Sequence, residues 1–334
     1  MTTSYFSFKT AKSEGVLPRV SVIVCTKGRP LELAACLEGL LRQGYQNLQV
    51  IVIDGEGDRT VRELVLSCGY IYVDQSRTDT AMNTPGARNL GVRQADGEVI
   101  AFIDDDAVPA KHWLSNLIRC YKEYNPAGVG GPVTTAMDRE RSSDNAYNHW
   151  FIRFTFLALM REDVRSVGRI YRSGLVTENW GLLKSGVQKV ESLIGTNMSF
   201  RKSWLDRVGP FDEFISTLGV GDETDLCLRV LEKGGVILVA SDAEVYHKLS
   251  PKGTPILRRY HSYFSEFYLI TKHMKYFSIP KVLTREVLNI LYLVVMCVPP
   301  SAKNIEWRYA LRGRLDAYLM ILQRALHEDS APHR

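Results

Sequence analysis

Short apolar segments alternate with amphipathic ones along the first half of the chain. The apolar segments are rich in β-branched residues and cover residues 19–26, 48–53, 70–73 and 98–103. The segments with a helical pattern are residues 30–42, 85–95 and 109–124, and Pro85 suits a first helical turn. Continuous apolar strands separated by helices are typical of a parallel sheet covered on both faces. The pattern therefore predicts a doubly wound, mostly parallel α/β layer.

The second half has a less regular pattern. Residues 134–189 mix aromatic and Gly-containing polar segments, and no element is assigned there. A regular pattern returns at residues 191–200, and helices are expected in 202–208 and 222–233 and a pair of strands in 236–247. After Pro255 the pattern is helical to about Leu326, with breaks expected at Pro280 and at Pro299-Pro300.

The composition and net charge indicate a globular protein that does not bind nucleic acid. Of 334 residues, 45% are hydrophobic and 24% charged, which is ordinary for a globular protein. The net charge of +5 is not concentrated in an Arg/Lys-dense stripe, so nucleic acid is not an expected partner. The six cysteines are scattered without a Cys-x-x-Cys pair, which indicates reduced thiols and a cytoplasmic protein.

Neither a leader nor a membrane span is expected. Residues 1–15 contain no apolar core of a signal peptide. The longest apolar run, residues 287–298, is shorter than the roughly 18 residues that a spanning helix needs.

Three consecutive carboxylates, Asp104, Asp105 and Asp106, follow the apolar strand at residues 98–103. Like charges this close repel unless a cation compensates them. Ligands of open parallel sheets bind outside the carboxyl ends of the strands, where these residues fall. Oxygen ligands suit Mg²⁺ or Mn²⁺, so a metal site is expected. The alternative is a solvated loop that caps the helix expected near Pro109.

A second acidic group, Asp222, Glu223 and Asp225, opens the helix predicted at residues 222–233. Acidic residues stabilise a helix N-terminus, so this arrangement has a purely structural explanation. A functional role requires that one of these carboxylates face the same cleft as the first cluster. His247, after the last predicted strand, is likewise more often structural than a ligand when considered alone.

Five segments, in the same order, resemble family 2 glycosyltransferases. They are VSVIVCTKGRP (20–30), VIDGEGD (52–58), PGARNLGVRQADGEVIAFIDDD (85–106), GTNMSFRKSWLDRVGPFDE (195–213) and GDETDLCLRVLEKG (221–234). The resemblance extends over about residues 20–247. It implies a GT-A fold in a catalytic domain at 19–250, preceded by an N-terminal extension at 1–18 and followed by a helical C-terminal extension at 251–334.

The resemblance also assigns roles to individual residues. It implies that the metal, Mn²⁺ or Mg²⁺, is bound by Asp106, Asp104 and His247. It implies that the catalytic base is Glu223, with Asp222 as its competitor, because the usual Glu-Asp order of this motif is reversed here. The residues that it assigns to the nucleotide-sugar donor are Thr26, Arg29, Asp54, Arg88, Asn89, Asp104 and Asp105. The loop at residues 54–58 departs from the family's usual base-binding sequence, so the nucleotide is not specified.

The implied activity is metal-dependent transfer of a sugar from a nucleotide-diphosphate sugar to a hydroxyl of a glycan or lipid-linked saccharide. A divalent ion neutralises the charge that develops on the leaving diphosphate. A carboxylate removes the proton of the acceptor hydroxyl. One base opposite the leaving group implies inversion at the anomeric carbon, by analogy with sugar hydrolysis. A Gln-x-x-Arg-Trp element, typical of processive members, is not evident, so addition of a single sugar is expected.

Other functions are less consistent with the sequence. A sugar-phosphate nucleotidyltransferase should have a Gly-rich N-terminal loop, but the first strand ends in CTKGRP. A dehydrogenase should have Gly-x-Gly-x-x-Gly after that strand. A catalytically inactive nucleotide-sugar-binding protein remains an alternative, supported by the reversed order of Asp222 and Glu223.

The region that begins after Pro255 is basic and aromatic. Lysines and arginines alternate with tyrosines and phenylalanines over residues 258–281, next to the apolar run at 287–298. Such a region suits peripheral attachment to the inner face of the cell membrane, with a helical lid on the catalytic domain as the alternative. Of the five tryptophans, Trp150 and Trp180 are candidates for stacking on an acceptor sugar.

Overall fold

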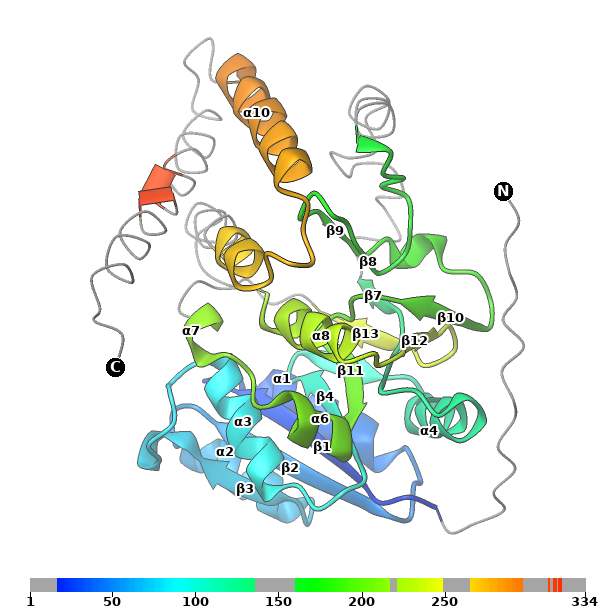
Figure 1. Cartoon of the computed structure of the whole chain (residues 1–334). Helices are drawn as coiled ribbons and strands as arrows, with labels where there is room; N and C mark the ends of the chain where they lie inside the picture. Colours follow the sequence, from blue (N-terminus) through cyan, green and yellow to red (C-terminus); the bar gives the residue numbers. More distant parts are fainter. Residues whose placement is uncertain are drawn as a thin grey trace, which may run out of the picture.

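A computed structural model describes residues 17–135, 160–216, 221–248 and 265–296, together with positions 312, 315, 316, 318 and 319. Figure 1 shows these residues as a central sheet flanked by helices, with a hairpin and a long helix, α10 (Ile279–Met296), at one end. The described residues include Leu17 and Pro18 of the predicted N-terminal extension and part of the predicted C-terminal extension. The boundaries of the three predicted regions stay predictions.

The main sheet has eight strands in the order β10-β12-β6-β11-β4-β1-β2-β3. Strands β3, β2, β1 and β4 are mutually parallel, whereas β11 runs antiparallel to both β4 and β6, and β10 antiparallel to β12. The predicted α/β class and mostly parallel sheet are therefore confirmed. The strands are β1 (Val20–Thr26), β2 (Leu48–Asp54), β3 (Ile71–Asp74), β4 (Val99–Asp104), β6 (Gly128–Gly130), β10 (Val187–Val190), β11 (Asn197–Arg201) and β12 (Ile237–Ala240).

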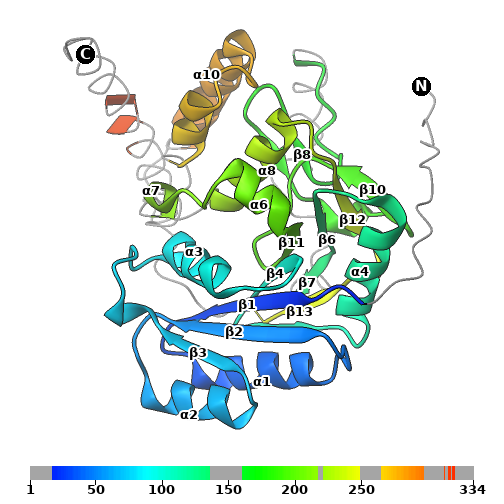
Figure 2. The same cartoon turned by 60° about the horizontal axis from the view of Figure 1, so that its bottom comes forward.

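Helices cover both faces of this sheet (Figure 2). Along β1 the side chains of Val22 and Val24 pack on one face with α1, α2 and α4, and Ile23 packs on the other face with α3, α6 and α8. All three side chains are fully buried, which explains why β1 is apolar throughout instead of alternating. The helices are α1 (Pro30–Leu41), α2 (Arg59–Ser67), α3 (Thr84–Gln94), α4 (Trp113–Tyr124), α6 (Lys202–Val208), α7 (Glu213–Ser216), α8 (Asp222–Glu232) and α10 (Ile279–Met296), and short 3₁₀ turns are η1 (Gln75–Arg77) and η4 (Trp180–Leu182).

A small second sheet positions the end of the β4 segment. It consists of β5 (Ala107–Pro109), β13 (Val245–His247) and β7 (Val133–Thr135) in the order β5-β13-β7. The prediction of a helix from residue 109 was wrong at its start, because residues 107–109 pair with β13 and the helix begins only at Trp113. The partner strand lies more than 130 residues further along the chain, so local pattern could not indicate the pairing.

The part of the chain that had no assignment includes a short hairpin, β8 (Arg169–Ile170) and β9 (Val176–Thr177). Residues 265–272 are helical, and non-helical residues 273–278 separate them from α10. The break expected at Pro280 is therefore confirmed, with Pro280 itself in the first turn of α10. Pro299-Pro300 lie outside the described residues. No helix in the described ranges combines the length and the apolar character required to cross a bilayer.

The five cysteines within the described ranges are free thiols, as predicted, and Cys36, Cys120 and Cys227 are buried. Cys297 lies outside these ranges.

Candidate active site

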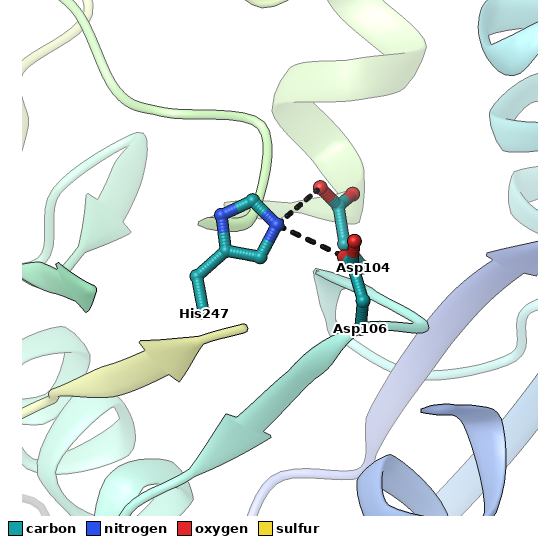
Figure 3. Close-up of side chains that lie close together, drawn as sticks. All are labelled: Asp104, Asp106 and His247. Atoms are coloured by element: carbon teal, nitrogen blue, oxygen red, sulfur yellow. Dashed lines mark hydrogen bonds and ion pairs between the residues drawn. The ribbon is translucent and has the colours of Figure 1, made fainter. Parts of the chain in front are cut away.

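The end of β4 and the end of β13 bring two carboxylates and an imidazole together (Figure 3). In the small sheet His247 lies opposite Ala107, the residue after Asp106, so the register of the sheet sets this approach. His247 Nε2 lies 2.9 Å from Asp106 Oδ1 and 4.0 Å from Asp104 Oδ2. One ligand atom from each of the three residues lies within 4.8 Å of the other two.

These atoms fit a divalent cation. Octahedral ligands about 2.1 Å from a metal lie about 3 Å apart when adjacent and about 4.2 Å apart when opposite. The two separations measured from His247 Nε2 are close to these values. Two carboxylates with one imidazole suit Mn²⁺, and Mg²⁺ accepts the carboxylates readily. The residues therefore fit the metal that the sequence implies.

Arg29 and Thr26 hold the middle of the Asp104–Asp106 cluster. Arg29 forms ion pairs of 2.8 Å with both Asp105 and Asp106, and the Thr26 hydroxyl donates a 2.7 Å hydrogen bond to Asp105. Asp105 has no exposed surface, and burial raises the pKa of its carboxyl to about 6, although Thr26 and Arg29 favour its charged form. Asp105 thus points into the protein and anchors the loop that carries the other two carboxylates.

Arg88 of α3 joins the two acidic groups. Its guanidinium lies 2.5 Å from Asp222 Oδ2 at the start of α8 and 3.9 Å from Asp104 Oδ1. Arg88 is buried, and although burial opposes its charge, Asp222 and Asp104 raise its pKa above the ordinary arginine value. The start of α8 therefore lies beside the end of β4, a proximity that spacing in the sequence did not reveal.

Glu223 lies next to the pair of Asp222 and Arg88 but is not the acid that Arg88 binds. Burial raises the pKa of Glu223, and the neighbouring Asp222 charge raises it further. The nearby Arg88 charge opposes this rise without cancelling it. A carboxylate with a raised pKa can accept a proton near neutral pH. Asp222, in contrast, is the carboxylate that Arg88 contacts directly, at 2.5 Å.

Two residues assigned to the donor make their contacts within the protein. Asp54, at the end of β2, accepts hydrogen bonds from the Glu56 and Asp58 amides and from the Tyr72 hydroxyl, and so orders the loop that follows it. Asn89 of α3 exchanges two hydrogen bonds with the backbone of Phe211. The roles of Asp54 and Asn89 in donor binding stay predictions.

Two groups of supporting residues were not among the candidates expected from the sequence. The Thr196 hydroxyl donates a 2.8 Å hydrogen bond to Asp104 Oδ2 and so orients this carboxylate. Its position in the GTNMSF segment was the only available signal. Lys272 and His273 each lie 2.8 Å from Asp225 Oδ1, and Arg229 of α8 binds the other oxygen of this carboxylate, Oδ2, at 2.8 Å. The spacing between residues 225 and 272 contained no signal of this contact.

Among the tryptophans, Trp113 lies fully buried in the core, as expected for most of them. Trp180 is partly buried, and its indole nitrogen has no hydrogen-bond partner among the described residues. Trp150, Trp307 and the basic and aromatic residues 258–264 lie outside the described ranges.

Comparison with known proteins adds to this geometry. The family model of glycosyl transferase family 2 matches residues 21–209. The chain is 29% identical over 250 residues to a glucosyl-dolichyl phosphate glucuronosyltransferase from Haloferax volcanii, with 69% of each protein covered. It is 24% identical over 283 residues to the dTDP-rhamnosyl transferase RfbF from Shigella flexneri, with 78% of this chain and 83% of that protein covered.

Solved structures with the same architecture include the mannosyltransferase PcManGT from Pyrobaculum calidifontis in complex with GDP-Man and Mn²⁺. The TM-score is 0.54 at 15% identity, over 94% of this chain and 91% of that one. Residues 1–349 of TarS from S. aureus give a TM-score of 0.54 at 17% identity, over 90% of this chain and 80% of that one. These likenesses confirm the predicted GT-A fold.

Proposed function

Because the chain belongs to glycosyl transferase family 2, whose model matches more than half of its 334 residues, we propose a specific reaction for it. The enzyme transfers a sugar from a nucleotide-diphosphate sugar to a hydroxyl of a glycan or lipid-linked saccharide, one sugar at a time. The observation that carries this proposal is the convergence of Asp104, Asp106 and His247 beside Arg88 and the start of α8. Family membership and the named relatives indicate a role in glycan synthesis.

We assign Mn²⁺ or Mg²⁺ to Asp104, Asp106 and His247. The distances between their ligand atoms support this assignment, as does the Mn²⁺ in the structure of the mannosyltransferase PcManGT. When bound there, the ion neutralises charge on the leaving diphosphate. Arg29 compensates the remaining oxygen of Asp106, and Thr196 orients Asp104.

We assign the catalytic base to Glu223. Arg88 binds the Asp222 carboxylate at 2.5 Å and occupies it, whereas burial and the Asp222 charge raise the pKa of Glu223, so Glu223 is the acid better able to accept the proton of the acceptor hydroxyl. A single base acting opposite the leaving group gives one displacement and inversion at the anomeric carbon.

We retain the donor contacts as assigned from the family: Thr26, Arg29, Asp54, Arg88, Asn89, Asp104 and Asp105. Of these, Arg29 and Asp104 keep about a quarter of their side-chain surface exposed and are the best placed to touch a ligand directly. The buried residues Asp54 and Asp105 act by fixing the loops that carry their neighbours.

We propose that the acceptor is lipid-linked or lies at the inner, cytoplasmic face of a membrane. The name of the Haloferax volcanii relative includes a dolichyl phosphate. Helix α10 leaves Ile279, Leu283 and Val287 exposed at intervals of four residues, so they form one apolar stripe along the helix. Lys275, which is exposed, precedes this stripe, and basic residues beside an apolar stripe are typical of helices that lie in a membrane interface.

A panel of UDP-, GDP- and dTDP-sugars tests the reaction, with Mn²⁺ or Mg²⁺ present and water as the acceptor. The expected product is a nucleoside diphosphate from one donor class. Release of pyrophosphate would instead identify a nucleotidyltransferase. Binding of a donor with no release, even with candidate glycan acceptors, would indicate the inactive binding protein.

A further inference from the structure

A cavity lies between the β8 segment and the start of α10, and none of the residues that line it belongs to the acidic site. Its volume is about 330 Å³. Ile170 in its wall belongs to a cluster with Leu228 of α8, so the cavity adjoins the helix that begins with Asp222 and Glu223. The residues that line it are Arg161, Glu162, Asp163, Ser166, Arg169, Ile170, Tyr171, Arg172, Tyr276 and Lys281.

Most charges around this cavity are compensated by neighbours. Glu162 is buried and forms a 3.2 Å ion pair with Lys281, and Arg169 pairs with Glu191 at 2.9 Å. Asp163 pairs with the exposed Arg165 at 3.1 Å. These three pairs leave no net charge.

Two guanidinium groups remain. Arg161 and Arg172 have no carboxylate partner among the residues that the structure describes, and Arg172 instead lies 5.6 Å from the centre of the Tyr276 ring. Arginine stays protonated in proteins, so the cavity has an excess of two positive charges. The phenol rings of Tyr171 and Tyr276 complete the wall beside them.

Two unpaired guanidinium groups suit a phosphate more than a single carboxylate. Arginine binds phosphate oxygens through paired N–H donors, and an excess of two charges matches a phosphate or diphosphate. A lid helix that only packs on the catalytic domain would not require these charges. Lys281 of α10 contacts Glu162 in the cavity wall, and the exposed Leu283 lies half a turn further along the same helix.

We propose that this cavity is an anion site for a phosphate or diphosphate group. The assignment of the anion rests on the cavity itself, and only its source rests on the proposed function. The source is either the phosphate of a lipid-linked acceptor, which a soluble diphosphate mimics, or the headgroup of an anionic membrane lipid. A phosphate bound in this cavity, from either source, would lie close to α8, the helix that begins with Asp222 and Glu223.

The test uses the full chain and two arms, without nucleotide-sugar or added metal. Calorimetry measures binding of inorganic pyrophosphate, and sedimentation measures binding to phosphatidylcholine vesicles with and without phosphatidic acid. The double variant R161Q/R172Q is compared with R59Q/R93Q, which removes two exposed arginines from α2 and α3 and the same total charge. Thermal melting of each variant and of the single variants R161Q and R172Q checks that the fold is retained.

We expect R161Q/R172Q to bind at least one probe at least tenfold more weakly, while R59Q/R93Q binds as the unmodified protein does. A loss confined to pyrophosphate identifies a soluble or acceptor-borne phosphate, and a loss on phosphatidic acid vesicles identifies a lipid headgroup. Equal binding by the two double variants in both arms overturns the proposal, as does a lack of binding to both probes by the unmodified protein. Because no donor is present, neither result depends on sugar transfer, whose failure would appear separately in the donor panel.

Discussion

Replacing Glu223 by glutamine removes the proposed base and leaves the shape of the side chain unchanged. Asp222 should stay paired with Arg88, because that contact does not involve residue 223. General-base catalysis contributes about 10²–10⁴ in rate, so the turnover of donor should fall by that factor. This corresponds to a rise of about 3–5 kcal/mol in the activation free energy.

The pH dependence of the reaction provides a second readout. Burial, and then the charge of Asp222, raises the pKa of Glu223 above its ordinary value of 4.5. The base works only when ionised, so activity should increase with pH through this raised pKa. In Glu223→Gln the residual rate should lose this increase. Release of nucleoside diphosphate, followed from pH 5 to 9 at saturating donor, measures both effects.

The contribution of Glu223 to the free energy of unfolding should decrease with rising pH, whereas the activity increases. An acid whose pKa is higher in the folded than in the unfolded protein binds its proton more tightly when folded, so its contribution to stability decreases as pH rises above the unfolded value. Glu223→Gln should therefore unfold at equal or higher urea concentration than the unmodified protein at pH 8. Asp222→Asn is the matched control, and it should lose about 3 kcal/mol because it leaves the buried Arg88 without its closest charge partner.

The assignment of the base would be refuted by one combination of results. In this combination Glu223→Gln keeps its rate and pH profile, while a folded Asp222→Asn loses activity. Asp222 would then be the base, and its contact with Arg88 would belong to a resting state of the site.

Three further changes test the surroundings of the site. Thr196→Val removes the hydroxyl that orients Asp104, and Mn²⁺ affinity measured by calorimetry should fall by about 10–100-fold, whereas an unchanged affinity would exclude this role. His273→Gln should lower the free energy of unfolding by about 1–3 kcal/mol below pH 6.5. Burial disfavours the charged form of His273, but the hydrogen bonds to Asp225 and Glu232 outweigh this effect and raise its pKa. The loss of stability in His273→Gln should therefore decrease as pH rises through the raised pKa. Equal losses in urea unfolding at pH 6 and pH 9 would contradict this role of His273. Gly91→Ala places a methyl group 2.5 Å from Ile23, so the urea midpoint should drop by the equivalent of about 1–3 kcal/mol, and an unchanged midpoint would show that α3 can shift.

The parts of the fold that the sequence predicted are those with strong local periodicity. Strands β1, β2 and β4 and helix α8 lie within a few residues of their expected positions, because each consists of one apolar run or one amphipathic repeat. The elements that it did not predict depend on distant partners. β5 exists because it pairs with β13, and β8 and β9 are strands of two residues each, too short to show a period.

In the candidate site, too, the residues with a local sequence signal could be predicted and the contacts between distant segments could not. The carboxylates could be found from their position after a strand, and His247 only from the family resemblance. The contacts of Arg88 with Asp222 and Asp104 could not be predicted, because three separate segments meet there. Nor could the inward orientation of Asp105, which depends on Thr26 and Arg29 from the end of β1 and the start of α1.

In the proposed reaction, Asp104, Asp106 and His247 hold a divalent ion that is needed for cleavage of a nucleotide-sugar. The most direct test strips metal from the protein with EDTA, adds back Mn²⁺, and measures nucleoside-diphosphate release by the unmodified chain and by Asp106→Asn. EDTA should abolish release, Mn²⁺ should restore it in the unmodified chain, and the variant should stay at least a hundredfold slower at the same Mn²⁺ concentration. Full release by the EDTA-treated protein, or equal restoration in Asp106→Asn, would contradict this role of the ion.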